Sequence, residues 1–255
     1  MLLTSARYDP TLLDVDWNTR ANKGVPTPVM LLSYHVDRLA VAAEQHGWTQ
    51  SINKITAESL STVCETAVRN AGGVSEAAYK MRVLLGQDGS LSATATVLPR
   101  PAVPRDLLTP SDDPTDIRTI YLDTAPTPAF LFTRTKTTHR AHYNAARARV
   151  RLSPAPTPSD AHIDVLLFTP EGLLMETSIR NIAFKRDGRW VTPHVSTGCL
   201  PGVVRRYMIE QGQWEEASEG ELGLEDVQEG EIVMTTNGVE GCCLGCITRF
   251  QEQES

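Results

Sequence analysis

Hydrophobic positions in the first hundred residues change from helical spacing to strict alternation. Residues 30 to 47 predict a helix that ends at Gly47, with apolar residues at Leu39, Val41, Ala42 and Ala43. Residues 51 to 70 predict a second helix, with Thr56 inside it. Residues 79–85 and 91–98 alternate on either side of Gly86-Gln-Asp-Gly89, which predicts a β-hairpin. These patterns together predict a small α+β domain.

A proline-dense stretch from Pro99 to Pro114 predicts a connection between two domains, placed at residues 1–115 and 116–255. Beyond it, residues 117–123 predict a strand and 139–151 predict a helix rich in Ala and Arg. Three further prolines predict a surface loop, at Pro154, Pro156 and Pro158. No internal repeat is evident.

A second hairpin is predicted after this loop, with Asp164 to Thr169 as its first strand and Pro170-Glu-Gly172 as its turn. The return strand begins at Leu173 and continues to Phe184. It carries a polar group of residues, Glu176, Thr177, Ser178 and Asn181.

The Leu200-Pro-Gly202 turn opens a predicted helix that runs to about Gln211 and stops at Gly212. Proline fits directly ahead of a helix, and glycine lets the backbone approach a ligand closely. The unpaired N–H groups of Gly202, Val203 and Val204, together with the helix dipole, favour an anion at this end.

Three segments in this order carry a family resemblance: Lys136 in Phe132-Thr-Arg-Thr-Lys136-Thr-Thr-His-Arg140, the strand Glu176-Thr-Ser-Ile-Arg-Asn181, and Leu200-Pro-Gly202. The order resembles the fold-type IV pyridoxal phosphate (PLP) enzymes, which include branched-chain and D-amino-acid aminotransferases and aminodeoxychorismate lyases. The resemblance covers roughly residues 30 to 250. It implies an α+β / α/β fold with two domains, a small α+β N-terminal domain and a larger barrel-like domain, and PLP as the cofactor.

The resemblance also implies a role for each segment. Lys136 would hold the cofactor aldehyde and carry protons at the substrate carbon, which requires a neutral amine. Arg134 and Arg140 are candidates for keeping it neutral if they point inward. Glu176 would face the pyridine nitrogen of the cofactor, with Asn181 on the same cofactor-binding strand, and Gly202, Val203 and Val204 would hold its phosphate.

Two more segments complete the implied cofactor site. His35-Val-Asp-Arg38-Leu39 is similar to the family's His-x-x-Arg-Leu motif, whose arginine contacts the phosphate; His35 itself is interpreted as a packed or capping residue. The segment 235–239 is similar to the family's other phosphate-side loop, with Asn237 and Gly238 as cofactor-binding candidates. Gly238 stands where relatives often carry Ser or Thr, so only its backbone N–H would serve.

Lys80 and Arg82 alternate to one side of the 79–85 strand, which family members use to line the substrate pocket. With Arg140 and Tyr143 they are the predicted substrate-binding residues. The alternative is that Lys80 and Arg82 form the outer face of a half-buried sheet. Arg140, four residues after the lysine, resembles the lyase branch of the family.

The predicted activity is therefore that of an aminodeoxychorismate lyase, which converts 4-amino-4-deoxychorismate to 4-aminobenzoate and pyruvate in folate biosynthesis. A class IV aminotransferase acting on branched-chain amino acids, D-amino acids or another amine is the alternative, because both reactions use Lys136, Glu176 and the phosphate site. The presence of both residues argues against a non-catalytic relative. The resemblance further implies a homodimer.

The composition of the chain limits which classes of ligand and partner it can bind. A net charge of −7, from 24 basic and 31 acidic residues, argues against nucleic-acid binding, so an anionic amine substrate needs a local basic pocket. No apolar run approaches the ~18–20 residues of a membrane span, and no secretory signal is visible, which predicts a cytoplasmic protein without membrane contact. The Cys242-Cys-Leu-Gly-Cys246 group lacks a second pair at zinc-site spacing, so it predicts buried thiols on a strand and no metal site.

Overall fold

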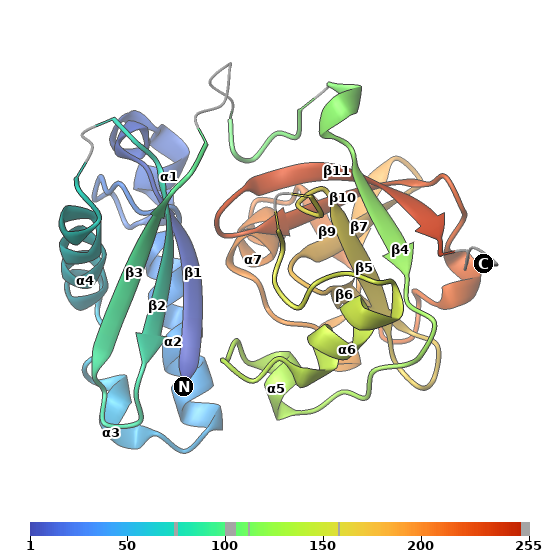
Figure 1. The fold of residues 1–255 in the computed structure, drawn as a ribbon, viewed down its shortest axis with the longest axis horizontal. Helices are drawn as coiled ribbons and strands as arrows, with labels where there is room; N and C mark the ends of the chain where they lie inside the picture. Colours follow the sequence, from blue (N-terminus) through green and yellow to red (C-terminus); the bar gives the residue numbers. More distant parts are fainter. Residues whose placement is uncertain (74–75, 100–105, 112, 158, 251–255) are drawn as a thin grey trace. The chain divides into compact units, whose positions relative to one another are not determined.

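The computed structural model describes residues 1–73, 76–99, 106–111, 113–157 and 159–250, which form two compact units (Figure 1). Unit 1 comprises Met1–Pro104, Thr135–His139 and Gly238–Glu240. Unit 2 comprises Arg105–Arg134, Arg140–Asn237 and Gly241–Ser255. Both units are thus built from separate stretches of the chain. Residues 100–105 and 112 of the predicted interdomain connection, and Pro158 of the predicted surface loop, lie outside the described residues.

Unit 1 is an antiparallel sheet in the order β1-β2-β3 with its helices packed on one face. The register pairs Leu2 with Leu85 and Tyr8 with Tyr79. Its strands are β1 (Leu2–Tyr8), β2 (Tyr79–Leu85) and β3 (Leu91–Val97), and its helices are α1 (Asp16–Ala21), α2 (Leu32–Gln45), α3 (Thr49–Ile52) and α4 (Ala57–Asn70), with a 3-10 turn at Pro10–Asp14.

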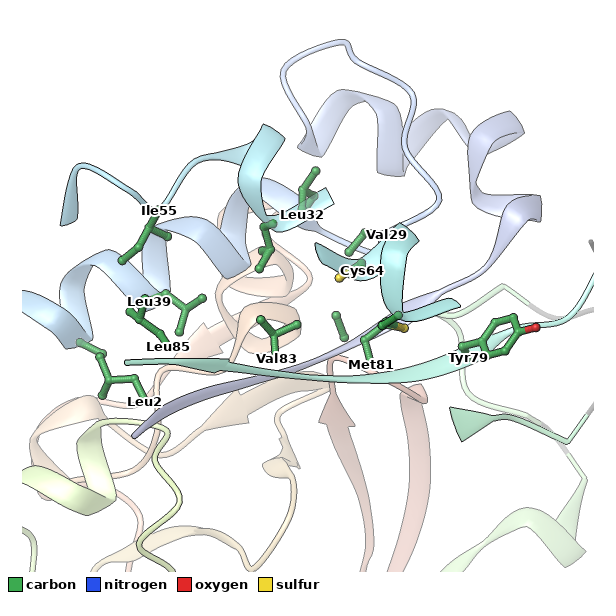
Figure 2. Packing of buried hydrophobic residues seen from close by; sticks show 14 of the residues in the cluster. Leu2, Val29, Leu32, Leu39, Ile55, Cys64, Tyr79, Met81, Val83 and Leu85 are labelled. Carbon is green, nitrogen blue, oxygen red and sulfur yellow. The ribbon is translucent and has the colours of Figure 1, made fainter. Parts of the chain in front are cut away.

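The core of unit 1 follows from the alternation along β2 (Figure 2). Met81 and Val83 are fully buried against Leu39 of α2 and Leu60 of α4, and Tyr79 and Leu85 share this face. Removing such side chains from water contributes about 1.5–3 kcal/mol each. The predicted hairpin of residues 79–98 is confirmed, with β2 and β3 paired from Leu85 and Leu91 onward.

The helix predicted over residues 30–47 is confirmed as α2, but the prediction of one helix from 51 to 70 is wrong. The structure has α3 and α4 there, separated by residues 53–56. Thr56 is the N-cap of α4: its Oγ1 accepts from Ser59 N at 3.0 Å, and Ser59 Oγ accepts from Thr56 N at 3.0 Å. This reciprocal capping box begins a helix, so Thr56 cannot lie inside one.

Unit 2 is built around an eight-stranded sheet in the order β6-β5-β4-β11-β10-β7-β8-β9, which curls into an incomplete barrel (Figure 1). β4 runs parallel to β5 and β11, β8 runs parallel to β9, and the other neighbours are antiparallel. The strands are β4 (Arg118–Leu122), β5 (Ile163–Phe168), β6 (Leu174–Thr177), β7 (Asn181–Arg186), β8 (Arg189–Thr192), β9 (Trp214–Glu216), β10 (Ile232–Asn237) and β11 (Gly241–Arg249).

The helices of unit 2 are α5 (Leu131–Arg134), α6 (Ala141–Arg149) and α7 (Val203–Glu210), with 3-10 turns at Pro114–Asp116, Val195–Thr197 and Leu224–Asp226. β5 is buried on both faces: Val165 and Leu167 pack with Tyr143 and Ala146 of α6, while Leu166 packs in a second cluster. A strand covered on both sides has a continuous apolar sequence, as predicted for residues 164–169. The predicted α+β architecture with a barrel-like second part is confirmed.

The predicted return strand from Leu173 to Phe184 is wrong in one respect, because the structure divides it into β6 and β7. A tight turn interrupts it at Ser178–Arg180, closed by Thr177 N donating to Arg180 O at 2.8 Å and Arg180 N donating to Thr177 Oγ1 at 3.0 Å. β6 pairs with β5, whereas β7 pairs with β10. The turn therefore moves the chain from one region of the sheet to another directly after Glu176.

Candidate active site

Glu176 is buried near the end of β6 and accepts hydrogen bonds from Tyr143, Leu200 and Asn181. Tyr143 Oη donates to its Oε1 at 2.6 Å, Leu200 N donates to the same oxygen at 3.1 Å, and Asn181 Nδ2 donates to Oε2 at 3.2 Å. Burial, followed by the neighbouring Glu176 carboxylate, raises the pKa of Tyr143 well above its ordinary value, so its hydroxyl keeps its proton and remains a donor. Donors from three elements hold the carboxylate in one orientation.

Asn181 joins the two sequence motifs of unit 2. Besides contacting Glu176, its Nδ2 donates to Leu200 O at 2.8 Å. Its Oδ1 lies so close to Gly202 that a Cβ at that position would approach it to 1.9 Å. Only glycine fits there without displacing the amide, so the acidic strand and the Leu200-Pro-Gly202 turn form one interlocked structure.

The N-terminus of α7 has the features of an anion site. Gly202 is its N-cap and supplies no side-chain hydrogen bond to the first turn, while Val203 and Val204 are buried. α7 packs against β10, on which the Oγ1 of Thr236 is buried with no hydrogen-bond partner among the described residues. An unpartnered buried hydroxyl costs about 1–3 kcal/mol unless a ligand satisfies it. Sequence reasoning named the segment that contains Thr236 but not this residue.

The predicted phosphate-side loop is divided between the two units. Asn237 ends β10 and is half-buried in unit 2, whereas Gly238 belongs to unit 1. The carbonyl oxygen of Gly238 accepts from Arg7 N of β1 at 2.8 Å. Cofactor contacts by Asn237 and Gly238 remain predictions.

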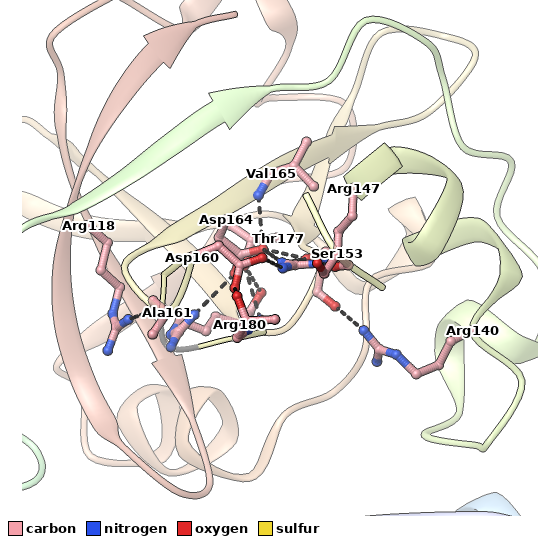
Figure 3. A network of polar contacts seen from close by, with 12 residues as sticks. Arg118, Arg140, Arg147, Ser153, Asp160, Ala161, Asp164, Val165, Thr177 and Arg180 are labelled. Carbon is pink, nitrogen blue, oxygen red and sulfur yellow. Dashed lines mark hydrogen bonds and ion pairs between the residues drawn. The ribbon is translucent and has the colours of Figure 1, made fainter. Parts of the chain in front are cut away.

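A buried ionic network holds the turn that follows Glu176 (Figure 3). Asp164, fully buried, accepts from Ser178 Oγ at 2.5 Å and from Thr177 Oγ1 at 2.7 Å, and pairs with Arg180 at 3.3 Å. Arg147 of α6, also fully buried, donates to Ser178 Oγ at 3.2 Å and pairs with Asp160 at 3.1 Å. Sequence analysis assigned neither Asp164 nor Arg147 to the site, although an Arg on the helix after the lysine was a visible signal.

Two predicted substrate-binding residues lie around Glu176. Arg140, the N-cap of α6, donates from Nη2 to Ser178 O at 2.9 Å, and its guanidinium carbon lies 4.9 Å from the centre of the Tyr143 ring. The Tyr143 hydroxyl is engaged with Glu176. Each residue thus has a structural contact of its own, and substrate binding by Arg140 and Tyr143 remains a prediction.

Lys136 is half-buried in a segment that pairs with the first strand of unit 1. Leu3 N donates to Lys136 O at 2.8 Å, and Thr137 forms an antiparallel bridge with Leu2. Immediately before the lysine, Thr135 Oγ1 lies 2.9 Å from Nε2 of His46, at the end of α2. Of the two arginines considered as candidates for keeping the lysine neutral, Arg134 is exposed.

Arg38 is half-buried and belongs to a polar group with two buried residues of unit 1, Thr4 and His35. Its Nη2 donates to Thr4 Oγ1 at 2.6 Å, and Thr4 Oγ1 lies 2.6 Å from Nδ1 of His35. Burial lowers the pKa of His35 well below its ordinary value, and the charges of Arg38 and Lys136 lower it further. His35 therefore lies within electrostatic reach of both cations, and its interpretation as a packed residue is confirmed.

Lys80 and Arg82 are exposed on the face of the β1-β2-β3 sheet opposite the helices. The register places Lys80 opposite Arg7 and Arg82 opposite Ser5. Like charges opposite each other destabilise a sheet unless an anion offsets them, and here Asp9 pairs with Arg7 at 2.7 Å. This is the outer face that the sequence left open as an alternative, and substrate binding there remains a prediction.

The family model for amino-transferase class IV matches residues 19–243. The chain belongs to this family. Family membership implies a PLP-dependent enzyme, and the confirmed resemblance explains why the lysine, glutamate and Leu-Pro-Gly segments occur together.

Curated relatives include the aminodeoxychorismate lyase of Saccharomyces cerevisiae, 35% identical over 199 residues, which are 66% of this chain and 51% of that protein. A putative aminodeoxychorismate lyase of Schizosaccharomyces pombe is 36% identical over 84 residues, 33% of this chain and 36% of that protein. The match with this chain thus spans about half the length of the first and about a third of the second.

Solved structures show the same fold. A putative amino-acid aminotransferase from Mesorhizobium loti superposes with a TM-score of 0.69 at 22% identity, covering 97% of this chain and 99% of that one. A putative 4-amino-4-deoxychorismate lyase from Legionella pneumophila superposes with a TM-score of 0.63 at 14% identity, covering 98% and 83%. At such identities these likenesses establish the fold alone.

The residues present fit PLP. Unit 2 offers an oriented carboxylate for a protonated ring nitrogen, and an uncapped helix start with the unpartnered Thr236 hydroxyl for a phosphate. Lys136 and Arg38 lie in unit 1, and their part in cofactor binding remains a prediction. The prediction of buried cysteines on a strand is confirmed for Cys242 and Cys243, which are buried on β11, next to β10. Within the described ranges, no helix has the length and apolarity to cross a membrane.

Proposed function

We propose that this chain is a PLP-dependent aminodeoxychorismate lyase that converts 4-amino-4-deoxychorismate to 4-aminobenzoate and pyruvate. The observation that carries the proposal is the 35% identity over 199 residues to the Saccharomyces cerevisiae lyase. The oriented Glu176 supports it, since this residue has the partners that the cofactor chemistry requires.

The cofactor, when bound, withdraws electrons from the substrate carbon that carries the amine. The residues of unit 2 hold it for this purpose. Glu176 would keep the ring nitrogen protonated through a charge-assisted hydrogen bond, and Tyr143, Asn181 and Leu200 N hold its carboxylate in place. The N–H groups at the start of α7 and the Thr236 hydroxyl bind the phosphate, with Asn237 and Gly238 as further cofactor contacts.

Residues of unit 1 supply the reactive amine and a second cation. The Nζ of Lys136 would hold the cofactor aldehyde, and as a general base it would take the proton from the amine-bearing carbon of the substrate. Arg38 neutralises charge on the phosphate. Lys80, Arg82 and Arg140 are the proposed partners of the two substrate carboxylates, because a chain of net charge −7 needs local cations to hold a dicarboxylate.

The deciding experiment mixes the purified protein with enzymatically generated 4-amino-4-deoxychorismate and follows 4-aminobenzoate and pyruvate, with no keto acid present. The lyase reaction needs no acceptor, so we expect many turnovers with both products in equal amounts. Lys136→Ala should abolish them, whereas Lys185→Ala, at an exposed lysine of β7, should not. Product formation that stops after one turnover, or that persists in Lys136→Ala, would contradict the proposal.

The same assay separates the aminotransferase alternative. An aminotransferase leaves the amino group on its cofactor and stalls until a keto acid removes it, so it would change its absorbance spectrum with amino acids alone and form no 4-aminobenzoate. We further propose that the chain acts as a homodimer, as the family resemblance implies. Sedimentation equilibrium of the purified protein tests this, and a monomer at all loading concentrations would contradict it.

A further inference from the structure

We propose that Thr4 and His35 form a hydrogen-bonded relay that positions Arg38 for the phosphate group of the cofactor. The proposal rests on the assignment of Arg38 to phosphate binding under the proposed function. It gives a role to Thr4, which lies on the first strand of the chain, and to His35, which sits one helical turn before the arginine.

The geometry around the Thr4 hydroxyl fixes the direction of the hydrogen bonds. Arginine can only donate, so at 2.6 Å Thr4 Oγ1 is the acceptor for Arg38 Nη2. The hydroxyl has a single hydrogen, and its other close partner is His35 Nδ1 at 2.6 Å. His35 Nε2 is buried with no hydrogen-bond partner among the described residues whichever ring nitrogen carries the proton, so the two tautomers differ at the hydroxyl. If Nδ1 also donated, the buried hydroxyl hydrogen would be left unpaired as well, at a further cost of about 1–3 kcal/mol. Thr4 therefore donates to Nδ1.

This arrangement requires His35 to be neutral, with its proton on Nε2. The environment provides that condition, because burial and the nearby Arg38 and Lys136 charges lower the pKa of His35 well below its ordinary value. The ring is therefore an acceptor at neutral pH. The relay runs from the Arg38 guanidinium through the Thr4 hydroxyl to the imidazole, and each member has one orientation.

The position of Thr4 on β1, next to Leu3, also supports the relay. The backbone N–H of Leu3 holds the carbonyl of Lys136 at 2.8 Å, and the adjacent Thr4 holds Arg38 at 2.6 Å. Two consecutive residues of β1 thus fix the position of the Lys136 backbone and the orientation of the Arg38 side chain. An arginine side chain has about 2 kcal/mol of rotamer entropy to lose, so fixing it beforehand favours binding of the group that it recognises.

The test compares cofactor affinity with and without the phosphate. The full chain is freed of cofactor and titrated with PLP and with pyridoxal, which lacks the phosphate, and the dissociation constants are measured by absorbance. Thr4→Val removes the hydroxyl at nearly constant shape. We expect it to weaken PLP binding about tenfold, the equivalent of about 1.4 kcal/mol, and pyridoxal binding less than twofold.

Two controls define the role. Thr4→Ser restores the hydroxyl and should restore the preference for PLP over pyridoxal. Thr27→Val removes another buried hydroxyl of unit 1, which accepts from Val29 N at 3.2 Å, and should leave the preference unchanged. A Thr4→Val protein that loses affinity for PLP and pyridoxal equally, or for neither, would overturn the relay.

Arg38→Ala distinguishes this proposal from the proposed function. If Arg38→Ala leaves the preference for PLP unchanged, the phosphate assignment of Arg38 fails. If Arg38→Ala removes the preference while Thr4→Val keeps it, only the relay fails. Should Thr4→Val not fold, His35→Leu gives the second test: it removes the acceptor that orients Thr4, so it should reduce the same preference, and an unchanged preference would refute the relay.

Discussion

Glu176 owes its orientation to residues distant in the sequence. Tyr143 lies 33 residues before it and Leu200 lies 24 residues after it, and both donate to the same carboxylate oxygen. A sequence motif can identify the acidic residue, but it cannot show which side chains surround it. The Tyr143 hydroxyl illustrates this limit, since the sequence placed it at the substrate and the structure shows it bonded to Glu176.

Changing Glu176 to Gln should leave the cofactor bound but slow turnover by about 10²–10⁴-fold, because a neutral amide cannot hold the proton on the ring nitrogen as a carboxylate does. Steady-state rates and the cofactor content of the purified protein measure the two effects. Glu171→Gln, in the exposed turn before β6, is the matched control and should be unaffected. Near-normal turnover in Glu176→Gln would exclude this role.

His35 should make stability depend on pH in the acidic range. Its folded-state pKa is lowered below the ordinary 6.5, so its contribution is fully present above about pH 6.5 and is lost as pH falls, when the unfolded chain takes up a proton that the folded chain refuses. The unfolding free energy should fall by up to about 1.4 kcal/mol per pH unit from this group. Denaturant titrations of wild type and His35→Leu from pH 7.5 to 5 measure it. Parallel pH profiles would contradict the prediction.

The elements themselves were predictable wherever spacing or caps determine them. Apolar spacing and Gly47 located α2, the Leu200-Pro-Gly202 turn and Gly212 located α7, and alternation located β2 and β3. The division between α3 and α4 was missed, although Thr56 and Ser59 stand at capping-box spacing. β1 was not predicted, because its buried positions Leu2, Leu3 and Thr4 do not alternate simply between the two faces of a sheet.

The turn directly before α7 depends on the absence of a side chain at Gly202. Gly202→Ala would bring a methyl group to 1.9 Å from Asn181 Oδ1, so we expect the amide to move and the unfolding free energy to fall by about 1–3 kcal/mol. Chemical denaturation measures the loss. Combining it with Asn181→Ala removes the obstructing amide, so the double variant should lose less than the sum of the single losses. Simple additivity would show that the two residues do not interact.

The network of α6 and β5 should be costly to break from one side. Arg147→Met removes a fully buried guanidinium that pairs with Asp160 at 3.1 Å and lies 3.9 Å from Asp164. Because Asp160 then loses its buried partner, the unfolding free energy should fall by about 3–5 kcal/mol. Arg189→Met is the control: its ion pair with Glu215 at 2.6 Å is largely exposed, so its loss should cost about 0–1 kcal/mol. Equal losses of unfolding free energy in both variants would show that burial of the ion pair does not increase its contribution to stability. Circular dichroism during urea unfolding gives both values.

At the scale of the whole molecule, the family and the α+β fold could be predicted from the sequence, because they follow from short motifs in a fixed order, whereas the cofactor roles of the motif residues remain predictions. The buried partners of those residues could not be predicted, since Thr4, Arg147 and Asp164 belong to no motif. Nor did the sequence indicate that Lys136 and Gly238 would group with the N-terminal unit. Such groupings depend on pairing between distant strands, for which local patterns carry little information.

Unit 1 is built from three separate segments of the chain, which restricts how this protein can be recombined with its relatives. A chimera that exchanges only residues 1–104 would combine the β1 of one parent with the 135–139 and 238–240 segments of the other. The hydrogen bonds from Leu3 N to Lys136 O and from Arg7 N to Gly238 O would then join backbones that never evolved together. Each chimera in a recombination library should therefore take all three segments from the same parent. A single crossover at the connection after residue 104 would separate them.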